Sequence, residues 1–305
     1  MDPKSLPPLK RISQYTANLA LGGVIRLAMS LPYRWRIPAV GWFVSRVVAP
    51  LAGWRKRIRK NLAHAWPELP ESEVERIARE VPDNAGRTLI ETYSGAELKK
   101  RLASVTPEGP GWKVIEDARA AGRSVFIISG HFGNYDAVRS FVAMKFGDVG
   151  GLYRPLNNVY FNRHYEKALS QPSTPLFERG RRGLAQMMKF VREGNVMAML
   201  TDQHFDHGAP LTFFGKRAYT ALSVPEIALK YDVPIVPCYG IRQPDGLSFR
   251  LVFEDPIPHS TPEEMGQALN DSLEARVRDH PELWFWIHRR WKDRAHQPDP
   301  ADETA

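Results

Sequence analysis

The chain has 305 residues, of which 42 are Lys or Arg and 34 are Asp or Glu, so its formal net charge at pH 7 is +8. This length can bury the core of one elaborated domain, and the positive charge favours an anionic partner such as a phosphorylated lipid, a bilayer surface or an acidic protein. The single cysteine excludes an intrachain disulfide framework and a cysteine zinc site, and no motif typical of nucleic-acid binding is present.

Two apolar segments, residues 15–31 and 37–51, stand near the start of the chain. Neither reaches about 18 residues without a charged side chain, so neither predicts a secure transmembrane helix. No small-residue cleavage site of a signal peptide follows them. We expect residues 1–52 to form a membrane-associating helical segment, with Trp35 and Trp42 near the lipid headgroups. The alternative is an ordinary helical hairpin that packs on the core.

A strongly basic segment follows the apolar ones. Residues 54–60 contain five cations among seven residues, and their place after the apolar segments favours contact with anionic headgroups. Beyond them, Ser72 and Glu75 have the spacing of a capping box, which predicts a helix start. A helical pattern resumes after Pro82, and a further helix over residues 112–121 is expected to lead into the first strand.

Residues 124–136 read Ser-Val-Phe-Ile-Ile-Ser-Gly-His-Phe-Gly-Asn-Tyr-Asp and join a buried strand to a helix. In an open α/β sheet such a junction is the usual place for a site. Within one helix, His131 and Asp136 would point about 140° apart. We therefore predict a turn at Gly133 with Asn134 as the helix N-cap, which folds the imidazole back onto the carboxylate.

This predicted pair suits proton transfer. A carboxylate on one ring nitrogen of His131 fixes the tautomer and leaves the other nitrogen free as a general base. No serine or cysteine nucleophile stands in the motif, although Ser129 is two residues away. The pattern therefore indicates activation of a hydroxyl group on a substrate, and a surface pair or a helix cap is the alternative interpretation.

Later segments add candidates for binding an anion. Residues 149–155 predict a strand that ends near Arg154, whose guanidinium matches the geometry of phosphate and carboxylate. The basic, glycine-punctuated loop over residues 178–183 precedes a helix. Arg179 in this loop is therefore a candidate for holding an anion at the helix start.

A third buried strand is expected over residues 196–202, and it ends at Asp202 and Gln203. Read alone, Asp202 with His204 and His207 would suggest a metal site. The other interpretation is a loop that becomes ordered when a substrate binds.

The segment over residues 211–220 sets Phe214 and other aromatic side chains beside cations. It predicts either the lining of an apolar groove with cations at its mouth or simple core packing. At the end of this segment, Thr220 is expected to cap a helix over residues 223–231.

The last part of the sequence completes the pattern. Strands over residues 234–239 and 248–253 form a pair across a turn, and Thr261 precedes a last helix with proline just inside its start. Residues 284–292 are both aromatic and basic, which is typical of a membrane interface but also of a tryptophan-rich core. Residues 294–305 are polar and predicted to be disordered.

Strands alternate with helices along most of the chain. This alternation indicates an α/β fold with a mixed, mostly parallel sheet flanked by helices. The predicted organisation is a membrane-associating segment over residues 1–52, one catalytic domain over residues 53–293 and a tail over residues 294–305.

Residues 130–136, Gly-His-Phe-Gly-Asn-Tyr-Asp, resemble the His-x4-Asp/Glu motif of the lysophospholipid acyltransferase superfamily. The resemblance is greatest to its lipid A biosynthesis branch, the lauroyl/myristoyl acyltransferases. Further segments resemble this family in family order, from about residue 50 to 293, at residues 57–67, 151–155, 199–203, 213–215 and 286–292. The ordered set is much more specific than the His-x4-Asp motif alone.

The resemblance implies a glycerolipid acyltransferase-like fold and a reaction. A fatty acyl chain moves from a thioester of acyl carrier protein or coenzyme A to a hydroxyl of a glycolipid such as a lipid A precursor, with no metal or other cofactor. His131 is the expected general base and Asp136 the residue that orients it. Backbone amides near Gly133 and Asn134 are expected to stabilise the oxyanion. Members of this family work at the cytoplasmic face of the bacterial inner membrane.

The expected substrate-binding residues are Asn134, Arg154, Arg179, Asp202, Gln203, Phe214 and Thr220. The motif ends in Asp136 where many members of the lipid A branch have Glu, so another lysolipid, a mannosylated phosphoinositide or an ornithine lipid is an alternative acceptor. Two alternatives come from other classes. One is a non-catalytic membrane-binding protein, and the other is a metal-dependent hydrolase that uses Asp202, His204 and His207.

Overall fold

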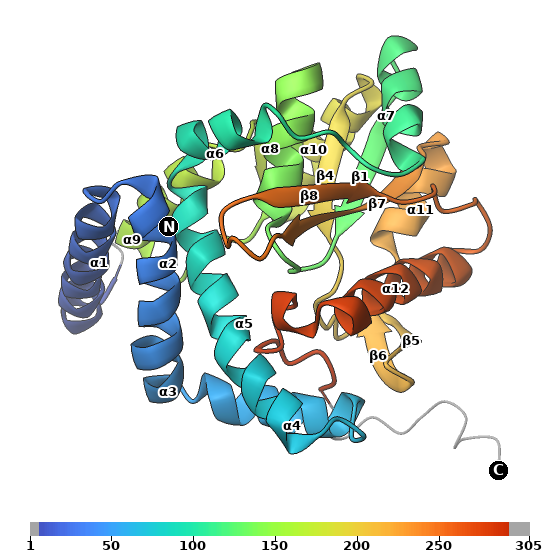
Figure 1. Cartoon of the computed structure of the whole chain (residues 1–305). Coiled ribbons are helices and arrows are strands. Elements are labelled where there is room, and N and C mark those ends of the chain that lie inside the picture. Colours follow the sequence, from blue (N-terminus) through green and yellow to red (C-terminus); the bar gives the residue numbers. More distant parts are fainter. Residues whose placement is uncertain (1–5, 293–305) are drawn as a thin grey trace.

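A six-stranded sheet forms the centre of the molecule (Figure 1), whose computed structural model describes residues 6–292. The strand order is β3-β2-β4-β1-β7-β8. All neighbours are parallel except β7 and β8, which are antiparallel. The strands are β1 (Val125–Ser129), β2 (Val149–Tyr153), β3 (Leu176–Glu178), β4 (Val196–Leu200), β7 (Ile235–Arg242) and β8 (Phe249–Phe253). The predicted mixed, mostly parallel α/β sheet is confirmed.

Helices cover both faces of this sheet, and its central strand is buried throughout. Successive side chains of a strand point to opposite faces, and all five residues of β1 are buried. Ile127 packs with α7 (Gly111–Ala120) and α8 (Tyr135–Phe146). Ile128 packs with α10 (Arg181–Arg192), α11 (Ser223–Tyr231) and α12 (Pro262–Asp279). The carboxyl end of β1 therefore opens between two helical layers.

Two predicted helix starts need correction, the one at Ser72 and the one after Pro82. Helix α5 (Glu71–Thr92) begins after Pro70 with no side-chain cap, and it continues through Pro82. The predicted capping box at Ser72 is therefore wrong. Helix α5 packs along α2 (Tyr33–Phe43), α4 (Trp54–Ala65) and the segment near residue 283. We attribute its continuity past the proline to this tertiary packing. By contrast, Thr261 and Glu264 form a complete capping box at the start of α12.

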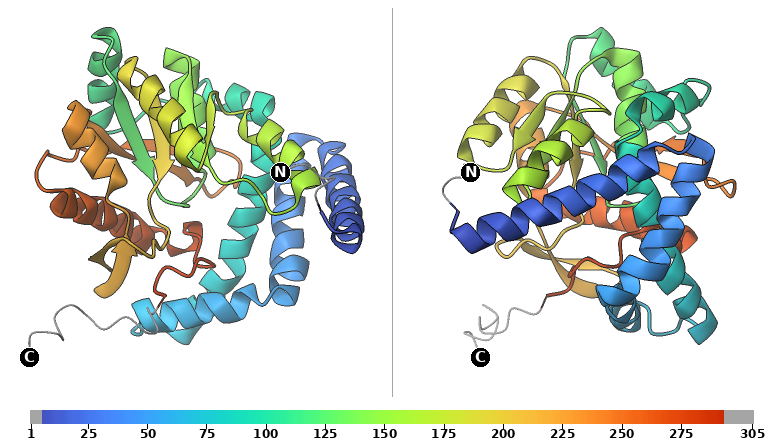
Figure 2. Two further views of the ribbon diagram at one scale, coloured as in Figure 1. Left: turned by 180° about the vertical axis from the view of Figure 1, so that it is seen from behind. Right: turned by 90° about the vertical axis from the view of Figure 1, so that its left-hand side faces the viewer.

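The N-terminal helices wrap around one side of the domain (Figure 2). They are α1 (Pro8–Met29), α2 (Tyr33–Phe43), a π-helical turn (Val44–Val48), α3 (Ala49–Leu51) and α4 (Trp54–Ala65). Helix α1 lies along α9 (Val159–Leu169), and α2 lies along α5. Within residues 6–292, no single helix has both the length and the apolarity to cross a bilayer. The span Tyr33–Leu51 and α4 reach that threshold only jointly, with an 85° bend between them.

The aromatic and basic segment near the C-terminus belongs to the core. Trp284 and Trp286 are completely buried and pack with side chains of α4, α5 and the hairpin of β5 (Ala209–Phe213) and β6 (Lys216–Thr220). Short helices η3 (Pro281–Leu283) and α6 (Gly95–Leu102) complete the described elements. The predicted tail at residues 294–305 lies outside the described residues, and the predicted domain boundaries stay predictions.

Candidate active site

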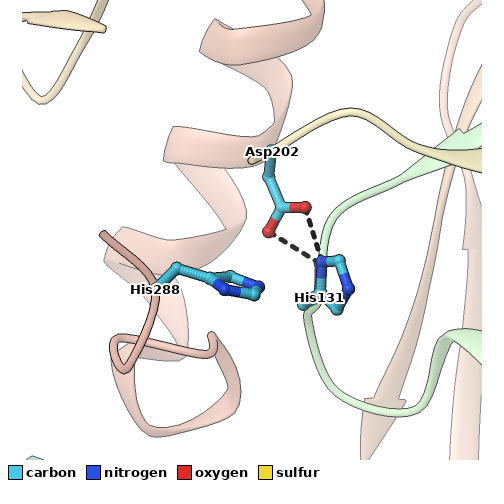
Figure 3. Close-up of side chains that lie close together, drawn as sticks. All are labelled: His131, Asp202 and His288. Carbon is cyan, nitrogen blue, oxygen red and sulfur yellow. Dashed lines mark hydrogen bonds and ion pairs between the residues drawn. The ribbon is translucent and has the colours of Figure 1, made fainter. Parts of the chain in front are cut away.

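His131 and Asp202 meet because their strands are neighbours. Strands β1 and β4 are parallel, with Ser129 opposite Leu200, so each of the two site residues follows its strand end by two positions. The His131 Nδ1 atom lies 2.7 Å from Asp202 Oδ1 (Figure 3). The backbone amide of His131 donates to the other carboxylate oxygen at 2.8 Å. One carboxylate thus holds both the ring and the main chain of the histidine.

Asp202 is a fully buried carboxylate with a third donor, because the Trp284 indole N–H donates to its Oδ2 at 2.9 Å. Burial alone would raise the pKa of Asp202, but the charge of His131 and the hydrogen bonds from this residue hold it well below its usual value. Asp202 therefore stays ionised. With an ionised acceptor on Nδ1, the ring of His131 carries its proton there, and Nε2 is available as a base.

His288 completes a group of three side chains (Figure 3). Its ring lies edge-on to that of His131, with 4.5 Å between ring centroids. The His288 Nε2 atom is buried and has no hydrogen-bond partner among the described residues. The ligand atoms of His131, Asp202 and His288 lie within 4.8 Å of one another, so this group is able to hold a metal ion. The sequence did not single out His288, although it lies in a segment that resembles the family.

The environment of His288 predicts a pH-dependent stability. Burial, followed by the charge of His131, lowers the pKa of His288 from 6.5 to about 4. Between these pH values the unfolded chain binds more protons than the folded chain, so the free energy of unfolding falls as the pH falls. Between pH 7 and pH 5 the free energy of unfolding should therefore fall in the wild type. In His288→Gln this fall should be smaller by about 1 to 2 kcal/mol. Urea unfolding at both pH values measures this difference. Equal losses in the two proteins would show that His288 is not buried in its neutral form.

The predicted pairing of His131 with Asp136 is wrong, because His131 pairs with Asp202 instead. Asp136 is buried in the first turn of α8, where its Oδ2 accepts a hydrogen bond from the Thr92 hydroxyl at 3.0 Å. Burial raises the pKa of Asp136, and the Arg139 guanidinium and the Thr92 hydrogen bond offset only part of this rise. The first turn of α8 directs Asp136 toward α5, while Asp202 occupies the position beside the imidazole.

The turn between His131 and α8 has the predicted shape but not the predicted role. Gly133 adopts a positive φ of 55°, and Asn134 caps α8 by accepting from the amide of Ala137. The amide of Gly133 donates to Leu283 O and that of Asn134 to Gly240 O, each at 2.9 Å. These two amides were expected to stabilise an oxyanion. Because both already have partners, that expectation is wrong for this conformation.

The other predicted substrate-binding residues fall into two groups. Arg154, Arg179 and Gln203 are exposed, and each follows a strand whose carboxyl end lies at the same edge of the sheet as that of β1. Asn134, Phe214 and Thr220 are buried in the protein interior. A substrate-binding role remains a prediction for all six. The exposed residues Arg154, Arg179 and Gln203 are the better candidates, since a buried side chain meets a ligand only after a rearrangement.

The buried residues Phe214 and Thr220 have structural partners. Phe214 packs against the rings of Trp66 and Trp286, as the core-packing interpretation predicts. The Thr220 hydroxyl accepts from the buried Arg290 guanidinium at 2.6 Å. Helix α11 starts after Leu222 without a side-chain cap, so the predicted cap at Thr220 is wrong.

The predicted metal ligands at His204 and His207 do not join Asp202. His204 Nε2 lies 2.9 Å from Asp206 Oδ1, and Asp202 is held by His131. In the described part of the chain, the metal-competent group includes Asp202 but neither of these two histidines.

Comparisons with known proteins point to one family. Residues 4–293 match the family model described as bacterial lipid A biosynthesis acyltransferase. The chain is 25% identical over 282 residues to a lipid A biosynthesis lauroyltransferase of Escherichia coli (strain K12), an alignment that covers 89% of this chain and 90% of that protein. It is 23% identical over 296 residues to the lipid A biosynthesis palmitoleoyltransferase of the same strain, with the same two coverages. A lipid A biosynthesis acyltransferase of Haemophilus influenzae is 20% identical over 255 residues, covering 80% of this chain and 79% of that protein.

Proposed function

Because this chain belongs to the bacterial lipid A biosynthesis acyltransferase family and is an acyltransferase, we propose that it moves a fatty acyl chain from a thioester to a hydroxyl of a lipid A precursor. The observation that carries this proposal is the 2.7 Å contact between a buried carboxylate, Asp202, and Nδ1 of His131. It leaves Nε2 on a side chain that is 22% exposed. That is the arrangement of a general base that accepts a proton from a substrate.

The proposed reaction is nucleophilic attack on the thioester carbonyl. His131 Nε2 takes the proton of the acceptor hydroxyl while the hydroxyl oxygen forms a bond to the carbonyl carbon of the thioester. The tetrahedral intermediate then breaks the C–S bond, and the departing thiolate takes up the proton from the imidazolium. Asp202 stabilises the imidazolium and holds the ring in place, and the Trp284 indole holds Asp202. Every atom and electron pair is accounted for without a metal or another cofactor.

The proposed donor is an acyl thioester of acyl carrier protein or coenzyme A. Both donors are acidic, and the chain has a net charge of +8, so electrostatic attraction favours their encounter. Arg154 and Arg179, exposed at the sheet edge that carries His131, are the proposed contacts to phosphates of the substrates. For the acceptor, another lysolipid remains the alternative within this reaction class.

We place the protein at the cytoplasmic face of the bacterial inner membrane. The exposed apolar side chains of the N-terminal helices support this proposal. Leu9 is 84% exposed, Leu27 73%, Trp35 60%, Trp42 59% and Leu51 85%. Such residues at this density favour contact with lipid, and the basic helix α4 next to them favours anionic headgroups.

The function is tested by transfer of a radiolabelled acyl chain from acyl carrier protein into total bacterial lipid. We expect a labelled product with the wild type, a loss of about a hundredfold or more with His131→Ala, and no effect of EDTA. His207→Ala is the matched control, because His207 is exposed and has no role in the mechanism. The mobility of the product identifies the acceptor class.

Two outcomes would contradict this proposal. Equal rates for the wild type and His131→Ala would remove His131 as the base. Loss of activity in EDTA with recovery on adding zinc would show that the group of His131, Asp202 and His288 works as a metal centre.

A further inference from the structure

A cavity lies between α1 and α9, away from the residues of the candidate active site. Its volume is about 210 Å³. Gly22, Ile25 and Arg26 line it from α1, and His164 and Lys167 line it from α9. None of His131, Asp202 and His288 takes part in its lining. The cavity is therefore separate from the proposed site of acyl transfer.

The charge of the cavity favours an anion. Three of its lining side chains, Arg26, His164 and Lys167, are basic, and none of the lining residues is acidic. All three have exposed side chains, so their nitrogen atoms are accessible.

A hydrogen-bond donor without a partner is a second feature that favours an anion in the cavity. Tyr93 lines the cavity, and its hydroxyl is buried and has no hydrogen-bond partner among residues 6–292. Burial raises the pKa of Tyr93 to about 12, so the hydroxyl keeps its proton and remains a donor at neutral pH. A buried donor left without an acceptor is costly, and an anionic oxygen that reached this hydroxyl would satisfy it.

The surroundings of the cavity are apolar, which favours a lipid over a free anion. Ile25 and Phe161 form apolar walls. On α1, Leu21 is 48% exposed, Val24 51% and Leu27 73%. A phosphate in the cavity would thus have apolar side chains beside it on the surface, where acyl chains can lie.

We propose that the cavity between α1 and α9 binds the phosphate headgroup of an anionic phospholipid, with the acyl chains lying along the exposed side chains of α1. The lipid is a bound ligand, distinct from the acceptor at His131. It fixes α1 against the domain and ties this face of the protein to the bilayer. This site extends the proposed contact with the membrane and is independent of the acyl-transfer chemistry.

Two neighbouring glycines give a matched pair of variants. A Cβ atom added at Gly22 or at Gly23 meets no atom within 4 Å, so both positions accept a side chain. Gly22 lines the cavity and Gly23 does not. Gly22→Phe should fill the cavity, whereas Gly23→Phe adds the same apolar ring to α1 and leaves the cavity open.

Isothermal titration calorimetry measures the binding of the soluble lipid dihexanoylphosphatidic acid to the full chain. We expect Gly22→Phe to weaken binding at least tenfold and Gly23→Phe to change it less than twofold. Lys167→Gln should also weaken binding, whereas Lys189→Gln on α10, where the lysine is 75% exposed, should not. Equal affinities for Gly22→Phe and Gly23→Phe would overturn the proposal.

A second arm identifies the source of the phosphate. Inorganic phosphate lacks the apolar contacts and should bind at least tenfold more weakly than the lipid, and equal affinity would assign the cavity to free phosphate instead. The acyl-transfer assay and the lipid-binding assay on the wild type together separate the two proposals. Acyl transfer without lipid binding in the wild type would reject this site alone, and lipid binding without acyl transfer would reject the proposed function alone.

Discussion

Asp202→Asn should slow acyl transfer by about a hundredfold to ten-thousandfold while the protein stays folded. The amide has nearly the shape of the carboxylate, but it is neutral. It no longer stabilises the imidazolium that forms when His131 takes up a proton, nor does it fix the proton on Nδ1. Initial rates with a radiolabelled acyl thioester measure the loss, and circular dichroism spectra and thermal melting show whether the fold is retained.

Two further aspartates make this experiment decisive. Asp206 lies in the same loop and its carboxylate is exposed, so Asp206→Asn should keep at least a third of the wild-type rate. Asp136→Asn examines the pairing that the sequence predicted. A near-normal rate for Asp202→Asn together with inactive Asp136→Asn would restore Asp136 as the residue that orients His131.

Removing the Arg242 guanidinium should destabilise the fold by about 3–5 kcal/mol, because it leaves a buried carboxylate without its counter-charge. Arg242 donates to both carboxylate oxygens of Glu91, at 2.6 and 2.7 Å, and the side chains are 6% and 0% exposed. Glu91 also accepts from Asn134, the N-cap of α8, at 2.7 Å. The ion pair thus supports the turn that carries His131. Urea unfolding of Arg242→Met measures the effect.

The control lies on the neighbouring strand. Arg250 pairs with Glu108 at 2.9 Å, but these side chains are 44% and 48% exposed, so Arg250→Met should cost less than about 1 kcal/mol. The double variant Glu91→Gln/Arg242→Met should be more stable than Arg242→Met alone, since the unpaired charge is gone. If the double variant is less stable than the single one, the buried charge is not the source of the loss.

The local part of the fold was predictable from the sequence because it depends on local signals. The apolar run before Gly130 predicts β1, and the Asn134 cap predicts the start of α8. The mostly parallel sheet follows from the alternation of strands and helices. Helix starts were less certain, since the capping pattern at Ser72 is outweighed by the way α5 packs.

The partner of His131 was not predictable in the same way. Asp202 is 71 positions away in the sequence, and the two meet only because β4 lies beside β1. No pattern within either segment encodes that strand order. The sequence did place both residues at carboxyl ends of strands, so Asp202 was recognised as a candidate and only its role differs. His288 gave no such signal, because it follows no strand and its segment is buried by long-range packing with α4 and α5.

The segment around Trp284 has a consequence for how this protein is made. Its residues hold His131, Gly133 and Asp202 through three contacts. Gly133 donates to Leu283 O, Phe285 donates to His131 O, and the Trp284 indole donates to Asp202. During translation the strands and most helices emerge before this segment does. A nascent chain that stops short of residue 283 therefore lacks all three contacts at the proposed catalytic centre. We infer that the growing polypeptide is kept inactive on the ribosome until nearly the whole domain has been synthesised.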